Sequence, residues 1–321
     1  MDGFAARSDD RFPNLWVMGA GHDHAARRAH DRGRLRVVLL LTVAVAVLEL
    51  VGAALSGSLA LLADAGHMFT DATAVVLALS ASYVATLPAT SRRTFGYHRA
   101  EILAALVNAV VLLGVCGYLL VAGVRRLAEP VDVDVAQLLA FASLGLVANL
   151  VSVGLLVSGG RESLNMRGAF LEALGDAVGS AAAIAAGLVI ATTGYTRADS
   201  IASLAVAALI LPRAWTLLRD CVRVLLEAAP PGLDVDVVRE HLVGAAGVSD
   251  VHDLHAWSIT SGMPALSAHV TVTDEALATR GVGQILDELG ACVHEHFGIE
   301  HATFQIEPES HREHEPGESH A

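Results

Sequence analysis

Four residues with nitrogen or oxygen donor side chains recur at a spacing of four in two apolar stretches of the chain. His67 and Asp71 form one pair within LADAGHMFTD, and Glu172 and Asp176 form the other within FLEALGD. Side chains four positions apart lie on the same face of a helix, so each pair presents two donors together. Two such helices side by side close a four-ligand site for one divalent cation.

One imidazole and three carboxylates form a donor set of borderline to hard character. Zinc favours about four N, O or S ligands, whereas calcium takes more oxygens and magnesium keeps several waters. Neither Cys nor Met occupies these positions, which argues against Cu(I). The donors must lose protons to bind a metal, so an exchange of metal for protons is chemically natural.

An ionisable group inside a membrane costs several kcal/mol unless it is paired or faces water. No Lys occurs in the chain, and no Arg is expected mid-span beside the quartet, so a cation or shared protons must supply the positive charge. The alternative is a set of interhelical hydrogen bonds or ion pairs. That alternative suits a single acid such as Glu49, which we interpret as structural. Asp64 lies one turn before His67.

The composition is that of a membrane protein. Of the 321 residues, 54% are hydrophobic and 17% are charged, against about 25% charged in soluble proteins. About 20 apolar residues cross a bilayer as a helix. Six stretches qualify, near 35–55, 58–87, 101–124, 135–158, 163–193 and 200–220. The prediction is an all-α polytopic membrane domain of six transmembrane helices. Its fifth helix must begin near Ser163 to bring Glu172 and Asp176 to the depth of the other pair.

The placement of Arg predicts the orientation, because cytoplasmic loops are enriched in Lys and Arg. With a cytoplasmic N-terminus, twelve Arg flank the cytoplasmic ends of the predicted helices and three flank the other ends. We therefore expect a multi-pass protein of the cell inner (plasma) membrane with both termini cytoplasmic. The first 34 residues have no apolar core and predict no cleavable signal peptide.

After Pro230 and Pro231 the pattern changes to that of a soluble domain. Helical patterns over 234–245 and 275–297, with strand-like alternation over 248–260, 265–273 and 301–307, predict the order α-β-β-α-β. This order is typical of a ferredoxin-like α+β domain. Residues 227–321 carry 3 Arg against 17 acidic residues, a balance that argues against nucleic acid as a partner.

Five motifs resemble the cation diffusion facilitators, a family that exports zinc and related divalent metals by proton antiport. They are SGSLALLADAGHMFTD (56–71), RRTFGYHRAEILAALVNAV (92–110), NMRGAFLEALGDAVGS (165–180), ADSIASLAVAALILPRAW (198–215) and GVSDVHDLHAWSITSG (247–262). The motifs are long and ordered as in the family. The resemblance runs from about Leu35 to Glu307, and the bacterial zinc/cobalt/cadmium branch is the most similar.

The resemblance implies a transport site on the second and fifth helices, each with His or Asp, three residues, then Asp. His67, Asp71 and Asp176 match this pattern. Glu172 departs from it, because zinc transporters commonly have His there, and the metal preference stays open. A second family site in the loop after helix two is expected to be absent, since the segment from Pro88 to Arg99 offers only His98.

The resemblance also implies that the cytoplasmic domain forms the dimer contact and binds regulatory metal. His252, His269 and Glu307 match ligand positions, whereas Gln305 replaces a His ligand, so no binuclear cluster is expected. His255 and His301 are substitute ligands. The other interpretation is that these are histidines on a polar strand surface.

The predicted organisation has four parts. A flexible cytoplasmic segment with His (1–34) precedes the transport domain (35–225), and a metallochaperone-like dimerisation domain (226–308) precedes a disordered His/Glu tail (309–321). The tail histidines are interpreted as incidental.

The predicted function is that of a secondary active transporter. As a homodimer in the lipid bilayer, it would export Zn(II), and also Cd(II) or Co(II), from the cytoplasm in exchange for protons by alternating access. The metal is substrate, and no catalytic cofactor is expected. Two alternatives stay open: a membrane metal sensor without transport, and an exporter that prefers Mn(II) or Fe(II) because of Glu172. An enzyme is not expected, because a metalloenzyme motif such as HExxH is absent.

Overall fold

The computed structural model describes residues 20–157 and 164–314, with side chains described over 37–157 and 167–311. In these residues the chain forms two compact units. Of the described residues, one unit contains 20–69, 122–157 and 164–206, and the other contains 70–121 and 207–314. The long helices α2, α3 and α6 pass from one unit into the other.

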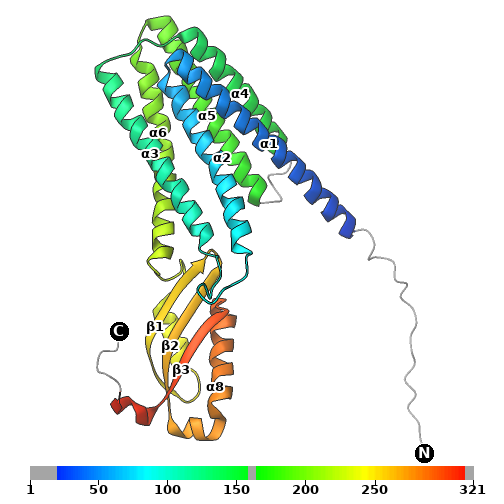
Figure 1. Ribbon diagram of the computed structural model, residues 1–321, viewed down its shortest axis with the longest axis vertical. Helices are drawn as coiled ribbons and strands as arrows, with labels where there is room; N and C mark the ends of the chain where they lie inside the picture. Colours follow the sequence, from blue (N-terminus) through cyan, green and yellow to red (C-terminus); the bar gives the residue numbers. More distant parts are fainter. Residues whose placement is uncertain (1–19, 158–163, 315–321) are drawn as a thin grey trace, which may run out of the picture. The chain divides into compact units, whose positions relative to one another are not determined.

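The membrane part consists of long apolar helices, labelled in Figure 1. They are α1 (Ala20–Ser56), α2 (Leu59–Ala85), α3 (Ala100–Ala128), α4 (Val135–Val157), α5 (Leu164–Thr193) and α6 (Arg197–Leu225). In the described part of the chain, six helices are long and apolar enough to cross a membrane. The prediction of six spans is therefore confirmed, and α5 begins within one residue of the expected Ser163.

Helical structure extends into both of the predicted end segments. Helix α1 begins at Ala20, so residues 20–34 extend the first membrane helix. This stretch contains no Pro and is rich in Ala and Arg, which favour helix. Residues 309–314 form the 3-10 helix η1 (Glu309–His314), where the Ser310 hydroxyl donates to Asp274. The side chains of His22, His24, His30, His314 and His320 lie outside the described residues.

Asp199, at the start of α6, fixes the beginning of α2. Its carboxylate accepts hydrogen bonds from the backbone N–H groups of Leu59 (2.7 Å) and Ala60 (3.2 Å) and from the Ser58 hydroxyl (2.5 Å). The first N–H groups of a helix have no partner within the helix, and a carboxylate there also opposes the positive end of the helix dipole. This cap fixes where α2 begins, and with it the positions of its donors.

Small residues on α5 allow close packing in the first unit. Gly187 lies against Leu138 and Leu139 of α4, and Ala183 is buried against α2 and α4. At Gly179 an added Cβ would lie 2.8 Å from Cγ of Asp64, inside contact distance. Gly175, one turn earlier, has open space around it. Small residues let membrane helices approach closely. Of the four small residues spaced four apart on α5, Gly179, Ala183 and Gly187 lie against neighbouring helices and Gly175 does not.

The soluble part of the second unit has the predicted order α-β-β-α-β. It contains α7 (Val235–Val243), β1 (Val248–Thr260), β2 (Met263–Val272), α8 (Asp274–Phe297) and β3 (His301–Pro308). The sheet order is β1-β2-β3, with β2 antiparallel to β1 and parallel to β3. Figure 1 shows α8 running along the sheet.

Alternation along the strands gives this sheet two different faces. Leu266, Ala268 and Val270 of β2 pack in a core with α7 and α8. The residues between them, including His269, therefore point to the opposite face. On β3 the core residues are Phe304 and Ile306, so that Glu307 lies on the same face as His269. The polar donors of three strands thus share one face.

We expect Gly179→Ala to destabilise the protein. Its matched control, Gly175→Ala, should not destabilise it. Replacing Gly by Ala inside a helix gains up to about 1 kcal/mol, but overpacking a filled site costs about 1–3 kcal/mol. At position 179 the added methyl group meets the Asp64 carboxylate. Thermal unfolding of the purified variants in detergent measures this. Equal midpoints for the two variants would contradict the close approach of α5 to α2.

Candidate metal centres

The membrane donors lie where the sequence predicts them, on α2 and α5. His67 and Glu172 are partly buried and Asp176 is 3% exposed. These three belong to the first unit, whereas Asp71 belongs to the second. Among the described residues, His67, Glu172 and Asp176 do not form a three-donor group with ligand atoms within 4.8 Å of one another. The quartet thus stays a prediction.

A buried polar cluster lies one helical turn from these donors in the first unit. The Ser180 hydroxyl is 3.0 Å from Oδ2 of Asp64 and 3.2 Å from Oε1 of Glu49, and the Asn149 amide donates to it at 3.3 Å. Glu49 is 0% exposed and Asp64 is 1% exposed. The cluster joins α1, α2, α4 and α5. Its contacts agree with the structural interpretation of Glu49.

One basic residue of the membrane part was missed by the sequence analysis. Arg213, directly after Pro212 inside α6, places Nη1 3.9 Å from Oδ2 of Asp71, within the second unit. The expectation that no Arg lies mid-span is therefore wrong. Long apolar segments flank this single Arg, so the mean hydropathy of the segment stays high in spite of its charge. Arg213 therefore supplies part of the positive charge that Asp71 needs.

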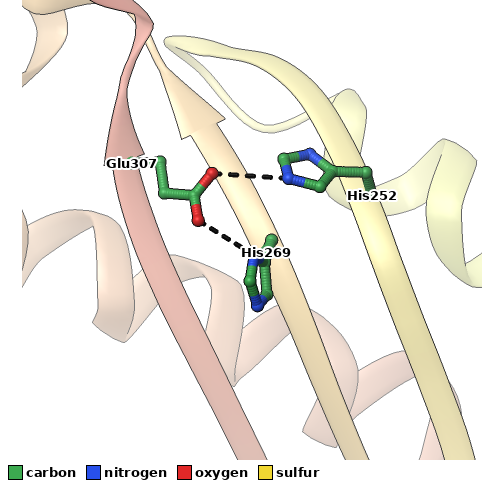
Figure 2. Close-up of side chains that lie close together, drawn as sticks. All are labelled: His252, His269 and Glu307. Carbon is green, nitrogen blue, oxygen red and sulfur yellow. Dashed lines mark ion pairs between the residues drawn. The ribbon is translucent and has the colours of Figure 1, made fainter. Parts of the chain in front are cut away.

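Three donor side chains of the sheet β1-β2-β3 lie close together. Glu307 lies between two imidazoles, with Oε1 2.9 Å from Nδ1 of His269 and Oε2 3.4 Å from Nε2 of His252 (Figure 2). Among the described residues, this is the one group of three or more His, Cys, Asp or Glu side chains with donor atoms within 4.8 Å. Two imidazoles and one carboxylate suit a zinc ion with an open fourth position.

A β-bulge lies between His252 and His255, and it places His255 on the face of this group but opposite Ser267, two residues along β2 from His269. His252 pairs with His269, but His255 pairs with Ser267, so β1 holds one extra residue between them. Asp253 within the bulge has φ 48°, a left-handed conformation that Asp tolerates. The bulge turns its carboxylate to Nε2 of His255 (3.1 Å) and Nε2 of His269 (3.7 Å). Asp253 is thus a partner of His269 that strand alternation alone does not identify.

Gln305 and His301 have other partners. The Gln305 side-chain amide donates to Oε1 of Glu307 at 2.6 Å, so Gln305 orients the carboxylate that both imidazoles contact. His301 lies edge-on to Phe95, with ring centroids 6.4 Å apart. His98 lines a cavity of about 1100 Å³ with Arg92 and Arg99. Neither His98 nor His301 belongs to the three-donor group among the described residues.

Family profiles cover both parts of the chain. Residues 35–226 match the cation efflux transmembrane domain, and residues 230–309 match the cation efflux protein cytoplasmic domain. The chain belongs to the cation diffusion facilitator family, and the resemblance noted from its motifs is confirmed. Members of this family are transporters and not enzymes.

Curated relatives of this cation diffusion facilitator match it over nearly their whole length. The metal cation efflux system protein CzcD of Cupriavidus metallidurans is 40% identical over 290 residues, which are 90% of each chain. The zinc transporter ZitB of Escherichia coli is 39% identical over 295 residues, 90% of this chain and 93% of that one. The cadmium, cobalt and zinc/H⁺-K⁺ antiporter of Bacillus subtilis is 36% identical over 296 residues, 91% and 93% of the two chains.

We expect Glu307→Gln to remove one zinc ion per chain from this cation diffusion facilitator. The substitution keeps the size of the side chain but removes the negative charge between His252 and His269. Loss of even an outer-shell partner typically lowers metal affinity about 10–100-fold, so loss of a ligand should lower it further. Zinc retained after EDTA treatment, reloading and gel filtration is measured by atomic absorption. Glu300→Gln, at an exposed position, is the control, and equal zinc content in both variants would remove Glu307 from the site.

Proposed function

We propose that the protein exports divalent metal cations, Zn(II) foremost and Cd(II) or Co(II) with it, from the cytoplasm in exchange for protons. The observation that carries this proposal is the set of donors on α2 and α5, held inside apolar helices of a cation diffusion facilitator. The similarity to CzcD, to the zinc transporter ZitB and to the cadmium, cobalt and zinc antiporter of Bacillus subtilis supports the choice of metals.

In this proposal His67, Asp71, Glu172 and Asp176 bind the transported ion. A metal would draw these donors together, and the contact of Ser180 of α5 with Asp64 of α2, one turn from His67 and Asp176, supports this proposal. Arg213 would give up Asp71 when a dication arrives and return to it when the dication leaves. Alternating access would expose this one site to each side of the membrane in turn.

Two features support protons as the counter-ion. The carboxylates and the imidazole of the quartet must be deprotonated to bind metal, so that metal release favours protonation. Beside them, Ser180 contacts both Glu49 and Asp64, yet a hydroxyl carries one hydrogen. The ion pairs described in this part of the membrane domain, Arg126–Asp199 and Arg213–Asp71, involve neither acid. A proton on the Glu49–Asp64 pair would complete both contacts.

The proposal extends to assembly and orientation. Residues 226–308 would dimerise two chains, and His252, His269 and Glu307 would bind a regulatory metal there. Residues 35–225 would form the transport domain, with both termini in the cytoplasm. The imbalance of Arg between the two ends of the helices supports this orientation. A homodimer brings two strongly acidic domains together, and bound dications would reduce their repulsion.

We expect Asp176→Asn to reduce zinc flux more than tenfold while leaving the protein folded and inserted. The amide keeps the shape of the side chain but loses the charge, and α5 offers no other carboxylate one turn away except Glu172. Zinc uptake into inside-out vesicles, driven by a pH gradient, measures this. Asp132→Asn, an exposed carboxylate, is the matched control. Flux at the wild-type level in Asp176→Asn would remove this residue from the mechanism, and no flux in the wild type would favour the sensor.

We expect Glu172→His to retain zinc transport, to reduce any Mn(II) or Fe(II) transport and to weaken the inhibition by acid. Imidazole favours zinc and cobalt over manganese more than a carboxylate does, and the substitution removes one anionic ligand. Competition uptake with zinc and manganese at two pH values compares the variant with the wild type. If Glu172 only bonds a neighbouring helix, selectivity and acid sensitivity will be identical in the two proteins.

A further inference from the structure

We propose a second metal site on the cytoplasmic domain, formed by His241 and His296 where the ends of α7 and α8 meet. The site would bind a borderline dication such as Zn(II). It shares no residue with the group of His252, His269 and Glu307, and it does not depend on the proposed transport activity.

The hydrogen bonds of the two rings fix which nitrogen is open. Nδ1 of His241 lies 2.8 Å from the Val237 carbonyl oxygen, and Nδ1 of His296 lies 3.0 Å from the Cys292 carbonyl oxygen. A carbonyl oxygen only accepts, so each Nδ1 carries the hydrogen and each neutral ring has its lone pair on Nε2. Histidines that bind metals almost always donate their other ring N–H in this way.

The two rings are close enough to share one ion. Their centroids are 5.3 Å apart and their planes are tilted by 51°. Phe297 packs edge-on against His241, with centroids 5.1 Å apart, and restricts that ring. Both histidines are exposed, and His296 borders a cavity of about 630 Å³. Water can therefore supply the remaining ligands of the ion.

The backbone at this place also favours a cation. His241 lies in the last turn of α7, which ends at the C-cap Gly244, and His296 lies in the last turn of α8, which ends at Gly298. The two helices pack against each other. The C-terminal end of a helix carries partial negative charge, so two such ends attract a dication. The acidic excess of residues 227–321 acts in the same direction.

Carbethoxylation of histidines, read residue by residue by mass spectrometry, tests the site in the full-length protein. The reagent attacks the free Nε2, and a metal bound there blocks it. Starting from EDTA-treated protein, zinc should protect His241 and His296 together and leave His294, an exposed histidine of the same helix, unprotected. Protection should need more zinc than that of His252 and His269, because the pair offers two protein ligands and not three.

The variant His241→Gln separates this site from the alternatives. We expect it to abolish the protection of His296 while the protection of His252 and His269 persists, which also shows that the domain remains folded. In the matched control, His294→Gln, zinc should protect His296 as it does in the wild type. Burial of this surface by zinc-induced dimerisation would protect His296 in His241→Gln as well. That outcome, or no protection of His296 in the wild type, would overturn the proposal.

Discussion

The membrane part depends on one constraint: a carboxyl group surrounded by apolar helices must find its partners within the protein. Ser180 meets this constraint for Glu49 and Asp64, and Asn149 donates to the same hydroxyl. The contacts fit because Gly145 and Gly179 leave room for the two carboxyl groups. Asp64 precedes His67 by one turn and Ser180 follows Asp176 by one turn, so the contact between Asp64 and Ser180 joins α2 and α5 one turn from these two donors.

The cytoplasmic domain places its donors by a different rule. Strand alternation sends apolar residues to α7 and α8 and leaves His269 and Glu307 on the other face of the sheet. There the side chains converge over three strands, and Gln305 orients the carboxylate between the imidazoles. His241 and His296 instead lie at helix ends, where hydrogen bonds to backbone carbonyls define the open nitrogen. Both arrangements consist of residues of the C-terminal domain alone.

The elements of this protein could be predicted closely because their signals are strong. The predicted strand 248–260 coincides with β1, and α5 begins one residue after the expected Ser163. The misses were single residues inside those elements. The contact of Arg213 with Asp71 was not predicted because Arg213 lies within an apolar run. The contacts of Asp253 were not predicted because a one-residue bulge interrupts the alternation of β1. Hydropathy and alternation are averaged over several residues, so an interaction made by one side chain does not change them detectably.

The sequence by itself determined the helices, the strands and the pairs of donors at a spacing of four, because periodicity and burial depend on neighbours along the chain. The resemblance to the family also marked His252, His269 and Glu307 as candidate ligands. Only the tertiary structure decided which donors meet. In the folded chain Glu307 contacts the imidazoles of His252 and His269. Asp253 contacts His255, and Arg213 contacts Asp71. Residues far apart in the chain come within a few ångströms only through helix packing and strand register. A bulge or a glycine sets these distances, but the residues that it brings together lie elsewhere in the chain, so the local sequence does not reveal them.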